Sequence, residues 1–203
     1  MCPLNEKDMA ETNRLLFGES DKRMQLVLAD DFGMVREKYI EVIEHTKDMD
    51  IHARWIYGKH PTDAMIQSYI DKQEMYLYMD GQNVAGMAAI TMYQGEDYHE
   101  MIWSQDLKDD EVASLHILTV VPGYQGKGVS KRMMADIISL VKKNGKKAIR
   151  LDALASNIPA RRLYEKLGFE YRGKQNLFAE NTGWTDFLYY ELLLEEKVRL
   201  RHQ

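Results

Sequence analysis

The sequence has little cysteine, no long apolar run and no excess of positive charge. Cys2 is the only cysteine among 203 residues, which excludes an internal disulfide and favours a reducing, cytoplasmic compartment. No apolar run approaches the roughly 18 residues that a membrane-spanning helix needs. The opening residues MCPLNEKDMAETN lack the basic and apolar regions of a signal peptide. We therefore expect neither export nor membrane association.

The charge balance argues against a general nucleic-acid binder. The formal net charge is -5 at pH 7, whereas such proteins use a basic face to displace counterions from phosphates. With 45% hydrophobic and 29% charged residues, the chain has the composition of an ordinary globular protein. We expect one domain over residues 24–195, preceded by an extension (1–23) and followed by a charged tail (196–203).

The first half of this domain predicts a strand, two helices and a hairpin. Residues 24–31 read as a strand, and apolar residues recur behind it at helical spacing. Thr62 can cap a second helix that ends near Gln73. Asp80-Gly81 marks a hairpin turn, because glycine readily adopts the positive φ that such turns demand. The acidic segment 94–111 reads as a solvated loop, with attraction of a cationic amine as the alternative. Its acidic residues are Glu96, Asp97, Glu100, Asp106, Asp109, Asp110 and Glu111.

The second half predicts a parallel crossover. An apolar strand at 112–121 leads through a glycine-rich loop into a helix that begins near Val129 and stops at Asn144-Gly145. A strand at 148–154, a short helix and a final strand at 187–194 follow. Because the crossover is parallel and the upstream hairpin antiparallel, we expect a mixed α/β sheet with helices packed on it.

The glycine-rich stretch PGYQGKGVS, residues 122–130, is a candidate anion site. Its amide groups lie beside the positive end of the following helix, where phosphate oxygens are favoured. A nucleoside triphosphate loop is excluded, because Val129 stands where that loop needs lysine. A dinucleotide fingerprint would need glycine at Lys131; since Asp152 follows at a suitable distance, this pattern remains the weaker alternative.

Two signatures resemble the GNAT superfamily of N-acetyltransferases. The acetyl-CoA loop of that family is matched by Leu118, Val120, Pro122, Gln125, Gly126, Gly128 and Val129, with Ser130 in place of the usual Gly or Ala. The second signature is filled by Asn157, Ala160, Leu163, Tyr164, Gly168 and Phe169. The resemblance implies a mostly antiparallel sheet over residues 24–195, with one parallel, splayed strand pair and helices on both faces.

The resemblance also implies acetyl-CoA as acyl donor. The sequence offers no cluster of metal ligands, so no metal is expected. The alternative for the loop glycines is a tight turn only, and the alternative for Asn157 is a helix cap, although capping and binding are compatible. The donor-binding residues that the resemblance implies are Leu118, Thr119, Val120, Gln125, Gly126, Lys127, Gly128, Val129, Ser130, Asn157 and Tyr164.

Tyr164 is implied as the general acid that protonates the departing thiolate, with core packing as its alternative. An amine acceptor needs a base, and Asp152 stands where some GNAT members carry an acidic residue. A surface or salt-bridged aspartate beside Arg150 is the alternative reading of Asp152. His116 and Glu111 are weaker candidates for the base. The tyrosine and tryptophan residues of NTGWTDFLYY either close the acceptor side or pack within the sheet.

Together these patterns predict an acetyl-CoA-dependent N-acetyltransferase. The acceptor is expected to be a primary amine of a small molecule or peptide, which attacks the thioester directly in a ternary complex. Neither nucleic acid nor membrane is an expected partner, and a homodimer is left open. The alternatives are a CoA-binding module without turnover and, less favoured, a dinucleotide-binding enzyme.

Overall fold

The structure is a computed structural model that describes residues 24–194, so the extension 1–23 and the tail 196–203 lie outside the described residues. Short 3₁₀ turns at Glu96–Tyr98, Asp109–Glu111 and Pro122–Tyr124 lie in the connections. The helices are α2 (Phe32–His45), α3 (Asp63–Asp71), α4 (Val129–Lys143) and α5 (Ile158–Lys166). The strands are β1 (Gln25–Leu28), β2 (Met75–Asp80), β3 (Asn83–Thr91), β4 (Val112–Val120), β5 (Ala148–Leu154), β6 (Glu170–Ala179) and β7 (Gly183–Leu193).

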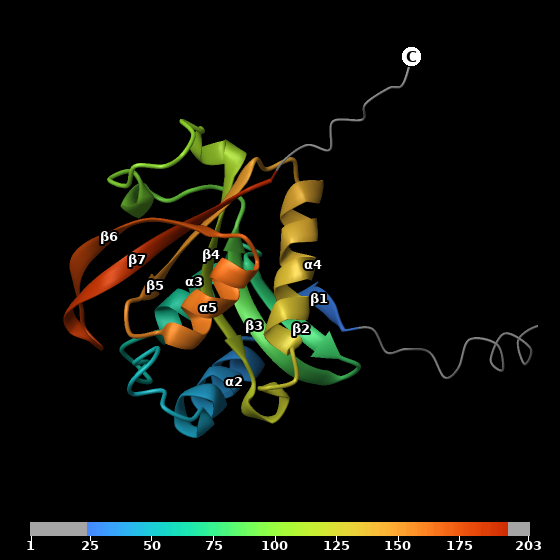
Figure 1. The fold of residues 1–203 in the computed structure, drawn as a ribbon. Helices are drawn as coiled ribbons and strands as arrows, with labels where there is room; N and C mark the ends of the chain where they lie inside the picture. Colours follow the sequence, from blue (N-terminus) through green and yellow to red (C-terminus); the bar gives the residue numbers. More distant parts are fainter. Residues whose placement is uncertain (1–23, 195–203) are drawn as a thin grey trace, which may run out of the picture.

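The strands form one seven-stranded sheet in the order β1-β2-β3-β4-β5-β7-β6 (Figure 1). Strands β4 and β5 are parallel, and the other neighbouring pairs are antiparallel. The predicted mixed α/β fold, mostly antiparallel with one parallel pair, is confirmed.

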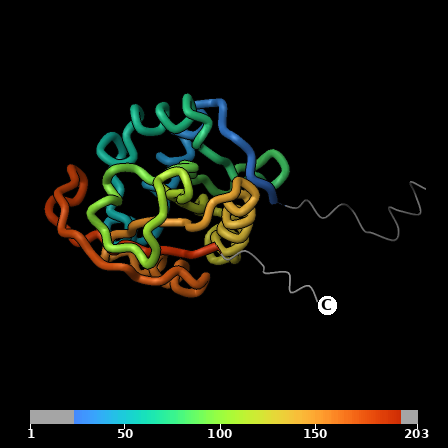
Figure 2. The backbone as a smooth tube through the Cα atoms, turned by 90° about the horizontal axis from the view of Figure 1, so that it is seen from above, coloured from blue at the N-terminus to red at the C-terminus, as the bar shows by residue number. Residues whose placement is uncertain are grey.

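Helices cover both faces of the sheet, as predicted. Apolar residues of α4, such as Met133 and Ile137, pack in one core with alternate side chains of the central strands. Val35 and Tyr39 of α2 pack with Ile66 of α3 in a second core on the other face. Figure 2 shows the α2 and α3 layer, blue to teal, across the sheet from α4 and α5, yellow to orange. Each face of the sheet is therefore buried, which explains why its central strands are so apolar.

The parallel pair separates halfway along its length. Strand β4 pairs with β5 only over Val112–Leu115 and Ala148–Leu151. Beyond these ranges, β4 continues from His116 and β5 from Asp152 without pairing to each other. The splayed strand pair implied by the GNAT resemblance is therefore present, and His116 and Asp152 lie where the gap opens.

A β-bulge in β4 accompanies this separation. Met87 faces Thr119 and Ala89 faces His116, so two residues of β4 lie opposite one residue of β3. Ile117 in the bulge has a φ of 44°, which is strained for a β-branched residue. The Tyr39 hydroxyl donates a hydrogen bond of 2.9 Å to the Ile117 carbonyl oxygen. Helix α2 thus helps to hold the bend that opens the gap.

Two segments differ from the sequence-based prediction. Strand β6 was not predicted; it is an edge strand without a fully buried residue, so no apolar alternation marks it. The acidic segment 94–111 is not simply a solvated loop, because Gln94 is 5% exposed and Tyr98 is 3% exposed. This segment folds back against the sheet near the gap.

Candidate active site

The glycine loop leaves the start of helix α4 open. Gly126 and Gly128 have φ values of 73° and 74°, a left-handed conformation that glycine adopts without strain. Gly128 is the N-cap of α4, and no side chain caps this helix, whereas α2, α3 and α5 are capped by side chains. A Cβ atom placed on Gly126 would meet no atom within 4 Å. The first amide groups of α4 are therefore available to an anion.

Side chains of the loop fix its position. The Gln125 side-chain amide donates hydrogen bonds of 2.9 Å to both Thr46 Oγ1 and the Val120 carbonyl oxygen. The loop is thereby attached to the end of α2 and to the end of β4. Lys127 Nζ donates to the Gly123 carbonyl oxygen at 2.8 Å, so this side chain is turned back onto the loop.

A cavity of about 460 Å³, here called the loop cavity, runs from the glycine loop to α5. It brings together every predicted donor-binding residue except Lys127, and Lys47 and Thr46 add polar groups at its edge. The predicted residues that line it are Leu118, Thr119, Val120, Gln125, Gly126, Gly128, Val129, Ser130, Asn157 and Tyr164.

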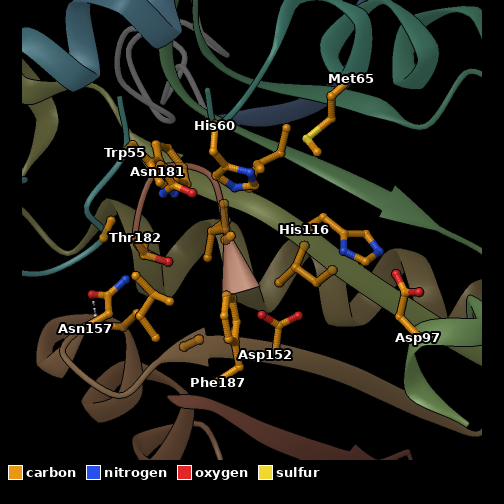
Figure 3. A pocket seen from close by; sticks show the side chains of 18 of the residues that line it. Trp55, His60, Met65, Asp97, His116, Asp152, Asn157, Asn181, Thr182 and Phe187 are labelled. Carbon is orange, nitrogen blue, oxygen red and sulfur yellow. Dashed lines mark hydrogen bonds between the residues drawn. The ribbon is translucent and has the colours of Figure 1, made fainter. Parts of the chain in front are cut away.

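A second cavity of about 340 Å³, the inner cavity, is lined by the predicted proton-transfer residues Asp152, His116 and Tyr164. Figure 3 shows His116 and Asp152 at this cavity. Several side chains border both cavities, so the two spaces are neighbours across the gap between β4 and β5. The shared residues are Ala53, Trp55, Leu118, Asn157, Ala160 and Tyr164.

Asp152 is held by a tyrosine that the sequence patterns did not reveal. The Tyr98 hydroxyl donates a hydrogen bond of 2.8 Å to Asp152 Oδ1. Tyr98 is itself fixed, because Trp103 Nε1 donates to its carbonyl oxygen at 2.9 Å. Arg150 pairs with Glu191 at 3.0 Å, so the alternative of an Asp152–Arg150 salt bridge is wrong. Asp152 therefore keeps a fixed carboxylate at the inner cavity.

Two histidines line the same cavity. His116 stacks on Tyr69 with ring centroids 5.9 Å apart. Burial lowers the pKa of His116, although the carboxylates of Asp152 and Asp97 oppose this shift. Burial also lowers the pKa of His60, a residue that no sequence motif marks. Both imidazoles are therefore neutral near pH 7 and can accept a proton.

Tyr164 lies on α5 at the junction of the two cavities. It is 6% exposed, and its ring packs against Phe169 and Tyr190. Burial raises the pKa of Tyr164, so its hydroxyl stays protonated at neutral pH. Within residues 24–194 this hydroxyl has no hydrogen-bond partner, although the side chain is almost fully buried. Such a group can donate its proton to a ligand in the cavity.

Asn157 and Glu111 occupy contrasting positions. Asn157 Oδ1 accepts a hydrogen bond of 3.3 Å from the Ala160 amide and caps α5, while the residue also borders both cavities. Both interpretations of Asn157 are therefore compatible with the structure. Glu111 precedes β4, pairs with Lys147 and lines neither cavity.

The turn between β6 and β7 closes one side of the inner cavity. Asn181, Thr182 and Phe187 line it, whereas Tyr189 and Tyr190 are buried in the sheet. Trp184 is 72% exposed, and none of the tyrosine and tryptophan residues of NTGWTDFLYY lines this cavity.

Over residues 24–194, no helix combines the length and apolar character that crossing a bilayer requires.

Comparisons with known proteins agree with this arrangement. Residues 40–169 match the family model described as Acetyltransferase (GNAT) family. The chain is 26% identical over 110 residues to mycothiol acetyltransferase of Brachybacterium faecium, covering 54% of this chain and 30% of the relative. It is 33% identical over 66 residues to N-acetylaspartate synthetase of Xenopus tropicalis, covering 32% and 24%. The matched parts thus span less than a third of the length of these two relatives.

Solved structures share the fold at low sequence identity. The protein yncA from Salmonella typhimurium, solved with acetyl-CoA, superposes with a TM-score of 0.61 at 18% identity, covering 86% of this chain and 95% of the other. The ribosomal-protein-S18-alanine N-acetyltransferase from Escherichia coli gives 0.59 at 16% identity, covering 89% and 100%. The family model matches well over half of the sequence, so the chain belongs to the acetyltransferase (GNAT) family.

Proposed function

We propose that this chain is an acetyl-CoA-dependent N-acetyltransferase, with residues 24–195 as its catalytic domain. The acetyl group moves to a primary amine of a small molecule or peptide. The observation that carries this proposal is the meeting of two cavities at Tyr164, one bordered by an open helix N-terminus and the other by Asp152 and His116.

The residues around the loop cavity fit the acyl donor. The uncapped amides of α4 and the Ser130 hydroxyl suit the pyrophosphate. The backbone of Leu118 to Val120 has no partner on β5 and can pair with the pantetheine arm. Acetyl-CoA, when bound, supplies an activated acetyl thioester. The side chains at the junction would hold the thioester next to the inner cavity.

The inner cavity supplies the proton transfers. Asp152, held by Tyr98, takes a proton from the acceptor ammonium, with His116 as the second candidate base. Asp152 passes this first proton to solvent. The neutral nitrogen then bonds to the acetyl carbon while the carbon–sulfur bond breaks, and the nitrogen gives up its second proton to the base. Tyr164 gives its hydroxyl proton to the departing sulfur, and the second proton restores Tyr164 through solvent. No bond to the protein forms in this direct transfer.

The arrangement favours turnover over the two alternatives. A module that only binds CoA has no need for a carboxylate held by Tyr98 and a protonated phenol, that of Tyr164, in one cavity. A dinucleotide enzyme would need glycine where Lys131 stands in the first turn of α4.

Acetyl-CoA is expected to raise the melting temperature, and NAD is not. A hundredfold excess over Kd adds about 2.7 kcal/mol to the free energy of unfolding. For a chain of this size, that corresponds to an increase of about 5–10 °C. Differential scanning fluorimetry with each ligand at the same concentration measures the shift. An increase with NAD and none with acetyl-CoA would show that the glycine loop belongs to a different class of enzyme.

A further inference from the structure

The inner cavity has an acidic lining without a basic counterpart. Asp97 and Asp152 line it, and no lysine or arginine does so among the described residues. His60 and His116 add no positive charge near pH 7, because burial lowers the pKa of both. Walls that carry charge of one sign concentrate ligands of the opposite sign. The cavity therefore favours a cation.

The two carboxylates have different roles available to them. Asp152 is fixed in the gap by Tyr98, whereas Asp97 is exposed and forms no ion pair within residues 24–194. Asp97 directly precedes Tyr98 in the chain. Because the Tyr98 hydroxyl contacts Asp152, the backbone at Asp97 and the carboxylate of Asp152 are about one tyrosine side chain apart. Figure 3 shows both carboxylates near His116, on separate elements. A short ligand could contact both.

Hydrogen bonds fasten the connection between α2 and α3 across the cavity. Arg54 Nη2 donates to the Thr182 carbonyl oxygen at 2.9 Å, and Asn181 Nδ2 donates to the Arg54 carbonyl oxygen at 2.8 Å. Ser156 Oγ likewise donates to the His52 carbonyl oxygen at 2.9 Å. A long peptide would have to break these hydrogen bonds to cross this side of the cavity. A small acceptor can bind without breaking them.

The rest of the cavity lining suits a ligand with a short hydrocarbon chain and an amine at the end that reacts. Trp55, Met65, Tyr69 and Phe187 contribute apolar and aromatic surface. The Tyr164 side chain is 6% exposed and lines this cavity, and its hydroxyl has no hydrogen-bond partner within residues 24–194, so it is free to contact a ligand there.

We propose that the acceptor is a small diamine. One nitrogen lies between Asp152 and Tyr164 and receives the acetyl group, while the second, as an ammonium, pairs with Asp97. This inference rests on the proposed function and specifies the substrate class of the same site.

Thiol release from acetyl-CoA with diaminobutane, with butylamine and with a short lysine-containing peptide tests this inference. For the intact chain we expect kcat/KM for diaminobutane to exceed that for butylamine by about fivefold, the upper range for one exposed ion pair. Asp97→Asn should reduce this ratio several-fold, mainly through a higher KM for the diamine. Added salt should reduce the ratio in the intact chain, because it screens exposed charges.

Asp106→Asn is the matched control, because it removes the same charge from the same segment without lining the cavity. This variant should keep the preference for the diamine. Equal rates with diaminobutane and butylamine, or an Asp97→Asn variant that keeps the preference, would overturn the diamine assignment and leave N-acetyl transfer standing. A peptide better than both amines would also overturn it. No thiol release with any amine would overturn the proposed function and this inference together.

Discussion

Tyr164→Phe is expected to lower kcat by about a hundredfold to ten-thousandfold, the usual contribution of a general acid. The substitution removes one oxygen and keeps the ring that packs against Phe169 and Tyr190. The lost hydroxyl has no hydrogen-bond partner within residues 24–194, so folding should change little. Without its proton the sulfur leaves as an unprotonated thiolate. Steady-state thiol release and titration with acetyl-CoA separate kcat from donor binding, and the Kd should be nearly unchanged.

Tyr171→Phe is a suitable control for this experiment. Tyr171 lies on edge strand β6, is 53% exposed and lines neither cavity. Its loss should leave kcat at the value of the unaltered chain. An equally active Tyr164→Phe variant would show that another group or water protonates the leaving sulfur. A variant that no longer binds acetyl-CoA would assign Tyr164 to donor binding instead.

Glu191→Ala is expected to lower the free energy of unfolding by about 3–5 kcal/mol, because it leaves a buried guanidinium without its counter-charge. The side chains of Glu191 and Arg150 are 0% and 1% exposed, and they pair at 3.0 Å. Arg172 also pairs with Glu191 at 3.0 Å. Burial alone would raise the pKa of Glu191, but hydrogen bonds from Ser104 and Arg150 bring it below its ordinary value. Urea denaturation measures the loss.

This ion pair also positions the acidic segment over the site. Both the amide and the hydroxyl of Ser104 donate to Glu191, and Arg150 lies 4.3 Å from the centroid of the Trp103 ring. Trp103 in turn holds Tyr98, whose hydroxyl contacts Asp152. We therefore expect Glu191→Ala to reduce kcat as well as stability, even though Glu191 lines neither cavity.

Glu170→Ala is the matched control for stability. Glu170 pairs with Arg172 at 2.7 Å, but its side chain is 70% exposed, so its loss should cost less than about 1 kcal/mol. The double variant Arg150→Met with Glu191→Leu should be less destabilised than Glu191→Ala, because no uncompensated charge remains buried. Equal stabilities for Glu191→Ala and Glu170→Ala would contradict the role given to the buried pair.

Local sequence patterns predicted most of the elements, because their signals lie within a few residues. Thr62 and Asn157 cap α3 and α5, and the Asp80-Gly81 turn joins β2 to β3. Strand β6 gave no such signal, since an exposed edge strand has no buried face to alternate. The bulge at Ile117 was equally unpredictable, because a β-branched residue is not expected at a φ of 44°.

The site was most predictable where a motif is continuous in sequence, although Asp152 and His116 were also predicted and line the inner cavity. The glycine loop and the stretch around Tyr164 are local signatures, and the structure brings them to one junction. The contact between Tyr98 and Asp152 joins residues 54 positions apart, and only the register of the sheet and the fold of the acidic segment create it. Asp97 and His60 reach the inner cavity for the same reason. The acidic character of the segment 94–111 was the one sequence signal for Asp97, and His60 had none.

The most direct test of the account is the initial rate of thiol release with acetyl-CoA and diaminobutane both varied. Direct transfer between two substrates held at the junction predicts no thiol release without amine, one acetylated amine for each thiol, and intersecting double-reciprocal lines. Mass spectrometry of the product identifies the N-acetylated diamine. Thiol release that does not depend on the amine, or parallel lines with an acetylated protein, would contradict the account.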